Sequence, residues 1–249
     1  MDTAAPLQKI VLLNPKGGSG KSTIATNLAA YYAWKGLNTA LMDTDPQGSG
    51  MRWLKQRPRG LPQIAAINGF ERPMGVTRSF ALRTPPGTER LIVDTPAALP
   101  AQQMPEVIRD ATAIVVPVLP SDIDTHAASR CIADLLLVAK VHRSERRLVI
   151  VANRARRYTK AFQSLVRFLQ SMRIPVAAVL RDSQAYVRSA ESGIGIHEMK
   201  GSLLRDDLET WRPLIDWLDH RSCSLVDTEE PQVQMAPPEP VAETVPVPA

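Results

Sequence analysis

Asn14-Pro15-Lys16-Gly17-Gly18-Ser19-Gly20-Lys21-Ser22-Thr23 is a glycine-rich segment between an apolar run and a helix-forming stretch. The run at residues 10–13 is short, partly β-branched and stopped by Asn-Pro, which predicts a buried parallel strand. Residues 22–35 are rich in helix formers and Gly36 provides a stop, which predicts a helix. The glycines let the backbone turn its N–H groups inward, and the helix N-terminus adds positive charge. The segment therefore predicts a phosphate-binding loop rather than a chance Gly/Lys turn.

The polar side chains of this loop have expected roles in binding Mg²⁺ and ATP. Lys21 is expected to reach the β- and γ-phosphates, the Ser22 hydroxyl to ligate Mg²⁺, and Thr23 to bond a phosphate nearer the base. Lys16 is a second lysine, placed five residues before Lys21. We predict that the nucleotide is held by Gly17, Gly18, Ser19, Gly20, Lys21, Ser22 and Thr23.

Composition divides the chain into a basic part and an acidic tail. The 249 residues carry a net charge of +5, but residues 222–249 hold five acids and no Lys or Arg, so the remainder carries +10. The same tail has six prolines and few large apolar residues, which predicts a disordered segment after one domain at residues 1–221. Two distant cysteines indicate a reducing compartment, and neither a signal peptide nor a membrane-spanning stretch is evident. We expect a cytoplasmic protein.

Further apolar runs alternate with helix-forming stretches, which is typical of an α/β fold. The pattern predicts a mostly parallel, twisted sheet flanked by helices, with ligands bound at the carboxyl ends of the strands. The expected strands are residues 39–42, 91–93, 113–118, 148–152 and 176–180, and the expected helices are residues 125–140, 160–172 and 202–218.

Three of the expected strand ends carry polar residues suited to a nucleotide site. Asp43 and Asp45 follow one strand at alternate positions, so they point to opposite sides and cannot share one role. Asp45 begins a Pro-Gln-Gly turn and is the better candidate for orienting the attacking water or the waters of the metal. Asp94 ends a buried strand and is expected to support Mg²⁺. Asn153 could pair with a purine edge, although an Asn at a strand end is more often a cap.

Together these motifs resemble the ParA/MinD family of deviant Walker A, P-loop NTPases over almost all of residues 8–218. The family pattern KGGxGK[ST]T is met by residues 16–23, DxDPQG by residues 43–48, and the acidic strand end by Asp94-Thr95-Pro96. The sequences of the glycine-rich and aspartate motifs are most similar to those of the small plasmid-partition and cargo-positioning branch, which lacks an N-terminal DNA-binding domain.

The resemblance implies an ATPase that works as a homodimer. Lys16 would cross the dimer interface to the partner's phosphates, and Asn153 would contact adenine. The expected catalytic residues are Lys16, Lys21 and Asp45, and the expected Mg²⁺ site comprises Ser22, Asp45 and Asp94. A ParB-like or other adaptor protein would stimulate hydrolysis, and the cargo would be a plasmid, a chromosome region or a protein assembly.

The region from residue 141 to residue 188 is rich in cations, which suits nonspecific binding of nucleoid DNA. A solvated basic face is the alternative on charge alone, and the resemblance favours DNA. The predicted contacts are Arg156, Arg157, Arg181 and Arg188. The region holds two acids, Glu145 and Asp182, against Arg143, Arg146, Arg147, Arg154, Arg156, Arg157, Lys160, Arg167, Arg173, Arg181 and Arg188.

Two other functions fit the same fold. A MinD-like membrane regulator would use an amphipathic C-terminal helix, but the helix expected near residues 203–218 has an acidic polar face, which favours core packing and no membrane. A metabolic ATPase of the amidotransferase kind would be expected to lack Lys16. Iron–sulfur relatives need paired cysteines, which this chain does not have.

Overall fold

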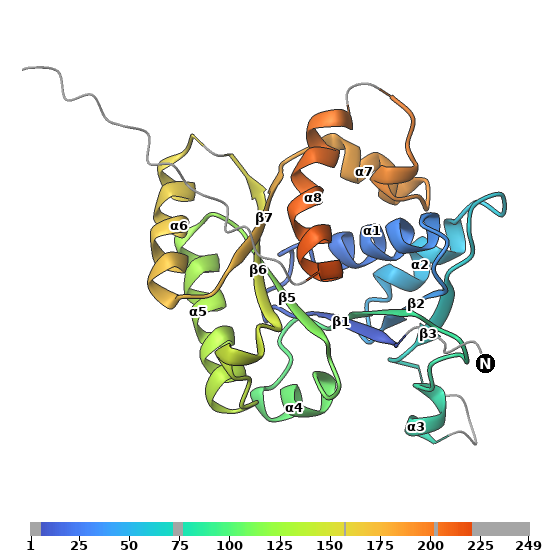
Figure 1. Ribbon diagram of the computed structural model, residues 1–249, viewed down its shortest axis with the longest axis horizontal. Coiled ribbons are helices and arrows are strands. Elements are labelled where there is room, and N and C mark those ends of the chain that lie inside the picture. Colours follow the sequence, from blue (N-terminus) through green and yellow to red (C-terminus); the bar gives the residue numbers. More distant parts are fainter. Residues whose placement is uncertain (1–5, 72–76, 157, 202–203, 221–249) are drawn as a thin grey trace, which may run out of the picture.

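The computed structural model describes residues 6–71, 77–156, 158–201 and 204–220. The described strands form one seven-stranded sheet in the order β3-β2-β4-β1-β5-β6-β7, and every pairing is parallel (Figure 1). The predicted α/β fold with a parallel sheet is therefore confirmed. The strands are β1 Gln8–Leu12, β2 Thr39–Asp43, β3 Ala65–Asn68, β4 Arg90–Asp94, β5 Ala113–Val118, β6 Leu148–Ala155 and β7 Val176–Arg181.

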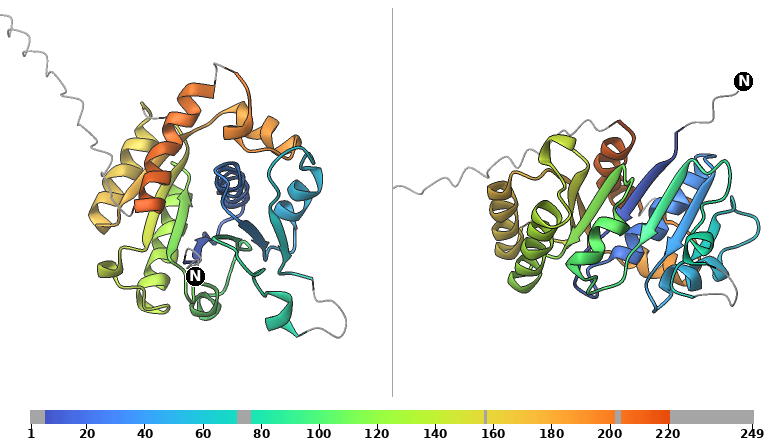
Figure 2. Two further views of the ribbon diagram at one scale, coloured as in Figure 1. Left: turned by 45° about the vertical axis from the view of Figure 1, so that its right-hand side comes forward. Right: turned by 90° about the horizontal axis from the view of Figure 1, so that it is seen from below.

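Helices cover both faces of the sheet (Figures 1 and 2). On one face, α1, α2, α7 and α8 share a buried cluster with sheet residues such as Ile10 and Leu12. On the other face, α4, α5 and α6 pack against Val11 and Leu13. The α-helices are α1 Lys21–Trp34, α2 Ser49–Gln56, α3 Arg78–Ala81, α4 Met104–Val107, α5 Asp122–Leu137, α6 Lys160–Met172, α7 Gln184–Glu191 and α8 Arg205–His220, and the 3₁₀ turns are η1 Ala101–Gln103, η2 Arg143–Glu145 and η3 Ile196–Glu198.

The apolar stripe of α8 belongs to the core, as its sequence predicts. Trp211 and Leu214 are fully buried and Leu218 nearly so, in the same cluster as α1. This surface is therefore covered by the protein itself. Among the described residues, no helix is long and apolar enough to cross a membrane.

Two parts of the fold differ from the expectation. The sequence did not predict α2, α7, β3 or the short helices α3 and α4. It also predicted an end of β6 at residue 152, whereas β6 continues to Ala155 because it pairs again with Arg181 after a register shift. The tail at residues 222–249 and Arg157, one of the predicted DNA contacts, lie outside the described residues.

Candidate nucleotide site

The glycine-rich loop lies between β1 and α1, at the carboxyl edge of the sheet. Its backbone needs glycine at two places, because Gly18 has φ +77° and Gly20 has φ +94°. The Asn14 side chain fixes the start of the loop: its Nδ2 donates to the Pro117 carbonyl at 2.6 Å, and its Oδ1 accepts from the Lys16 amide at 2.8 Å. The loop is thereby tied to β5 before α1 begins.

Asn153 holds the other end of the loop. Its Nδ2 donates to the Ser19 carbonyl at 2.8 Å, and its Oδ1 accepts from the Arg154 amide. The side chain presses so closely on Gly20 that a Cβ built there would lie 2.0 Å from Nδ2. Asn153 is 5% exposed and lies within β6, not at its end. The structure shows it as a positioning residue for the loop, and its expected contact with adenine stays a prediction.

Lys21 begins α1 and points back into the loop. Its Nζ donates to the carbonyls of Asn14 at 2.9 Å and Lys16 at 3.3 Å, and the residue is 6% exposed. Burial lowers the pKa of the Lys21 ammonium, and the nearby carboxylates of Asp94 and Asp45 oppose that shift. Two carbonyl oxygens hold the Lys21 ammonium inside the glycine loop, but neither oxygen carries a full negative charge. A phosphate bound in the loop would supply that negative charge.

Asp94 ends β4 and is fully buried, and it is close enough to Lys21 for the two charges to interact. Its carboxylate oxygens form no hydrogen bond of normal geometry within the described residues, although the Ser22 hydroxyl is close enough to stabilise the charged carboxylate. Burial raises its pKa to about 7; the Ser22 hydroxyl and Lys21 act against this rise, whereas Asp43 and Asp45 add to it. A fully buried carboxylate with only the Ser22 hydroxyl nearby to stabilise it has room for a further ligand.

The residues around Asp94 fit Mg²⁺ held jointly by protein and nucleotide. Mg²⁺ is typically bound through one or two carboxylates together with phosphates and water. The described residues contain no cluster of three or more His, Cys, Asp or Glu that could hold a metal by itself. Ser22 and Asp94 supply a hydroxyl and a carboxylate on one side, so the remaining ligands would come from phosphate and water.

Asp43 and Asp45 take separate positions, as their alternation predicts. Asp43 is fully buried and caps α2: its Oδ2 accepts from the Gly50 and Met51 amides at 2.8 and 3.1 Å. Its Oδ1 accepts from the Asp45 amide at 3.0 Å, which fixes the turn. Asp45 remains partly exposed and accepts from the Gln47 amide at 2.9 Å. The freer carboxylate is thus the predicted catalytic one.

Lys16 forms an ion pair with Asp124, a residue that was not among the predicted site residues. Its Nζ lies 2.7 Å from Oδ1 of Asp124, in the first turn of α5. The side chain of Lys16 is 34% exposed and that of Asp124 is 6% exposed. Ser121 caps the helix by accepting from the Asp124 amide, and its hydroxyl donates to the Asp124 carboxylate. The Ser121-x-x-Asp124 pattern after an apolar strand is typical of a capped helix start, and it could have indicated that Asp124 lies in the first turn of a helix.

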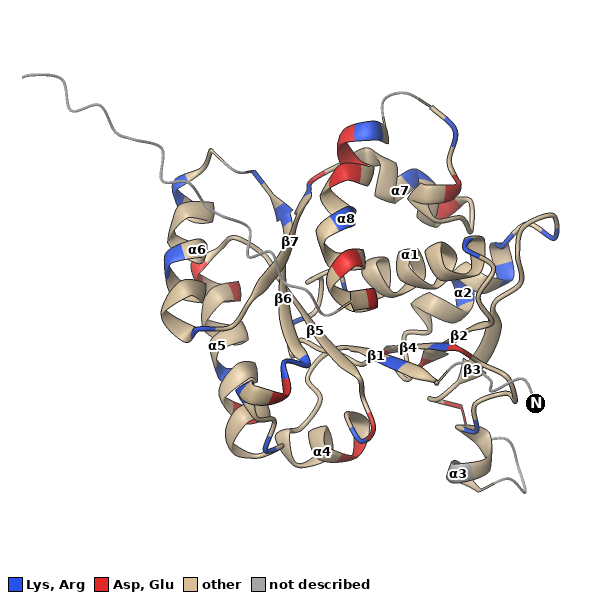
Figure 3. Ribbon diagram, in the orientation of Figure 1, with Lys and Arg blue, Asp and Glu red and all other residues tan. Residues whose placement is uncertain are grey.

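The predicted DNA contacts are largely occupied by ion pairs. Arg181 contacts Asp206 at 2.8 Å and Asp207 at 3.8 Å, both from α8. Arg156 lies 3.7 Å from Asp182. Basic and acidic positions are accordingly interleaved at the start of α8 (Figure 3). The two acids were expected on the polar face of this helix, but they were not set against the arginines because charges were counted only between residues 141 and 188.

Arg188 on α7 differs from these arginines. It is exposed and has no ion pair within the described part of the chain. Of the three predicted contacts that the structure describes, Arg188 is therefore the one without an ion pair that would compete with a phosphate backbone.

Comparisons with known proteins identify relatives of this chain in sequence and in fold. The maintenance of carboxysome distribution protein A of Gloeobacter kilaueensis is 29% identical over 219 residues, which cover 84% of this chain and 93% of the relative. The chromosome-partitioning ATPase Soj of Thermus thermophilus is 49% identical over 53 residues, 21% of each chain. The solved ATP complex of a Cyanothece McdA variant has the same fold, with a TM-score of 0.62 and 15% identity over 84% of this chain and 97% of that one.

The family model covers most of the chain. The model described as the CobQ/CobB/MinD/ParA nucleotide binding domain matches residues 10–196, which include the glycine loop, both aspartate turns and Asn153. With a parallel sheet, a glycine cradle and a buried lysine in the expected places, the chain belongs to this ParA/MinD family of nucleotide-binding proteins.

Proposed function

We propose that this protein is a Mg²⁺-dependent ATPase that dimerises over ATP, binds nucleoid DNA nonspecifically and positions a cargo with a partner that stimulates hydrolysis. The observation that carries the proposal is the arrangement of two lysines on one loop. Lys21 points into the loop, whereas Lys16 points out of it toward Asp124. Lys21 serves the bound nucleotide of its own subunit, whereas Lys16 reaches a neighbour once it leaves Asp124.

Lys21, Ser22 and Thr23 bind the phosphates in this proposal. Ser22 and Asp94 would hold Mg²⁺, which neutralises negative charge on the phosphates when bound. Asp45 orients the attacking water from the turn before α2, and Asp43 keeps that turn in place through its three backbone contacts. Because Asp45 is the less tightly held of the two, small movements of the turn would control hydrolysis.

Lys16 acts across the dimer interface in the manner of an arginine finger. It must leave Asp124 to reach the partner's phosphates, so dimerisation and hydrolysis become coupled to one side-chain rearrangement. Nucleotide loading then sets the lifetime of the dimer, and an adaptor protein that completes the site shortens it.

The DNA and cargo roles rest on charge and on the relatives. The first 221 residues carry the positive charge, and Arg188 forms no ion pair within the described part of the chain. The relatives include a carboxysome distribution protein and a chromosome-partitioning ATPase. We infer that this protein similarly distributes a cargo along the nucleoid, and that it acts in the cytoplasm.

A DNA mobility shift and liposome pelleting, each with and without ATP, test the proposal. DNA binding that requires ATP is expected, with no ATP-dependent pelleting. Binding only to liposomes would instead favour a membrane regulator, and failure to bind either would favour a metabolic ATPase. Light scattering tests dimerisation by measuring the molar mass with and without ATP. Lys16→Ala should abolish ATP-dependent dimerisation, whereas the control Lys35→Ala should not. A Lys16→Ala protein that still dimerised would contradict the role in trans.

A further inference from the structure

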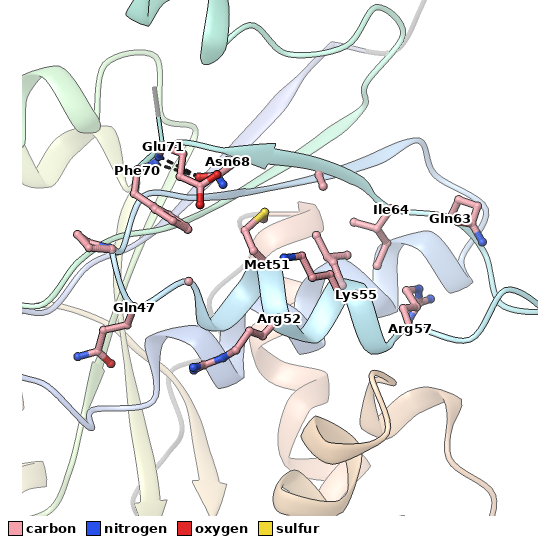
Figure 4. Close-up of a pocket in the computed structure, with 14 residues that line it drawn as sticks. Gln47, Met51, Arg52, Lys55, Arg57, Gln63, Ile64, Asn68, Phe70 and Glu71 are labelled. Atoms are coloured by element: carbon pink, nitrogen blue, oxygen red, sulfur yellow. Dashed lines mark hydrogen bonds between the residues drawn. The ribbon is translucent and has the colours of Figure 1, made fainter. Parts of the chain in front are cut away.

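A groove of about 440 Å³ lies between α2 and the edge strand β3, apart from the nucleotide loop. Its apolar surface comes from Met51 and Leu54 on α2 and from Ile64 and Phe70 on the other side. Met51 and Lys55 point from α2 toward the strand, while Arg52 extends from the rim (Figure 4). The groove thus combines an apolar lining with a cation directed into it.

The cations of this groove differ in whether they already form an ion pair with a carboxylate. Arg57 is committed to Glu198, with Nη1 2.9 Å from Oε2, and both side chains are almost fully buried. Arg52 and Lys55 are exposed, and neither forms an ion pair within the described residues. Glu71 is the one acid among the groove's described lining residues. The groove therefore favours an occupant that is acidic and partly apolar.

Residues 222–249 have this chemistry. They contain five carboxylates, no Lys or Arg, six prolines and several valines. Proline-rich segments favour an extended conformation that fits grooves with an aromatic wall, at low entropic cost. Valine and proline would contact the apolar lining, and carboxylates would approach Lys55 and Arg52.

The place where the described chain ends also suits this occupant. Residue 219, one position before the end of α8, is an aspartate that accepts a hydrogen bond from Tyr32 of α1, and α1 packs against α2. The tail therefore starts on the same face of the sheet as the groove. A flexible chain of this length has a root-mean-square span of roughly 30 Å, and tethering of this kind gives effective concentrations near the millimolar range. Weak contacts are then enough for occupancy.

We propose that the acidic, proline-rich segment 222–249 binds in the α2–β3 groove of its own molecule. One wall of that groove is the turn that precedes α2. Phe70 lies so close to Gly48 that a Cβ built on Gly48 would be 2.9 Å from the ring. A bound tail would contact the same Pro46-Gln47-Gly48 turn that carries Asp45, and it would restrain the movement of this turn.

Distances between two spin labels in the full-length, nucleotide-free protein test the proposal. One nitroxide is attached at Gln56→Cys, on α2 beside the groove, and the other at Met235→Cys in the tail, in a Cys223→Ser background. Cys131 is fully buried and stays unlabelled. Electron–electron double resonance should show a short, narrow distance population. A label at Gln163→Cys on α6, on the other face of the sheet, should give a broad distribution with the same tail label.

Charge reversal identifies the contacts. Arg52→Glu with Lys55→Glu should remove the short-distance population, whereas the matched reversal Lys160→Glu with Arg167→Glu on α6 should retain it. Glu229→Lys with Glu230→Lys should restore it in the reversed-groove protein. A broad distribution that ignores the groove charges would overturn the proposal. A short distance seen only between singly labelled copies after mixing would also overturn it, in favour of binding by the tail of a second copy.

Discussion

Replacing Asp124 with Asn tests whether the contact of Lys16 with its own subunit opposes dimerisation. The substitution removes the charge 2.7 Å from the Lys16 ammonium but keeps a side chain that can still bond to Ser121. Lys16 would then be free to leave without breaking an ion pair. We expect Asp124→Asn to dimerise more tightly with ATP than the natural protein.

The magnitude follows from the exposure of the pair. The Asp124 side chain is almost fully buried, but a third of the Lys16 side chain is exposed, so solvent screens the interaction. A pair of this kind contributes about 1 kcal/mol, near the upper end for exposed pairs. Two such contacts are released per dimer, so the dissociation constant should fall by roughly 30-fold.

Light scattering against protein concentration measures this constant in the presence of ATP, and an Asp45→Ala background limits hydrolysis during the measurement. Asp122→Asn is the matched control, because Asp122 lies in the same first turn of α5 but is exposed. It removes the same charge near the same helix end. Equal or weaker dimerisation of Asp124→Asn, compared with Asp122→Asn, would refute the idea that Asp124 restrains Lys16.

Three further outcomes are expected. Gly20→Ala should abolish nucleotide binding in a calorimetric titration, because its φ is +94° and its Cβ would collide with Asn153; unchanged affinity would show that the loop adapts. Asp45→Ala should stop phosphate release while leaving ATP-dependent dimers intact, and normal phosphate release would exclude Asp45 as the water-orienting group. Burial lowers the pKa of His197 to about 4, so the folded protein keeps this ring neutral while the unfolded chain takes up a proton below about pH 6.5. The free energy of unfolding should therefore fall by up to ~1.4 kcal/mol per pH unit between pH 6.5 and 4. Urea unfolding at pH 7 and pH 5 measures this fall. The free energy lost between the two pH values should be smaller for His197→Phe than for His126→Gln, the control at an exposed position.

Much of the fold could be predicted because its signals are local in sequence. The apolar run of β1 and the glycines that follow it specify strand, loop and helix over a short stretch. β3 was missed because Ala65–Asn68 is short and rich in alanine, which has low strand propensity, and its position is set by pairing with β2. α2 was missed because it is short and contains Gly50, and its cap comes from Asp43, outside the helix.

The parts of the site that could not be predicted depend on residues distant in sequence. Asp124 reaches Lys16 because β5 lies next to β1, which places the start of α5 beside the loop. Arg181 is paired with Asp206 because α8 packs against β7. Neither pairing follows from sequence spacing, so the charge count alone overestimated the cations available to DNA.

The contacts of the loop indicate which step of the proposed ATPase cycle could be controlled. Asn14 ties the loop to β5, Asn153 ties it to β6, and the Pro15 carbonyl accepts from the Ala98 amide at 2.8 Å in the segment after Asp94. These contacts preorganise the phosphate cradle from three sides, so nucleotide binding requires little backbone movement. Lys16 is different, because in the proposed dimer it must exchange a partner in its own subunit for the neighbour's phosphates. Because the phosphate cradle is fixed and only the Lys16 side chain has to change its partner, dimer formation rather than nucleotide binding is the step on which regulation can act.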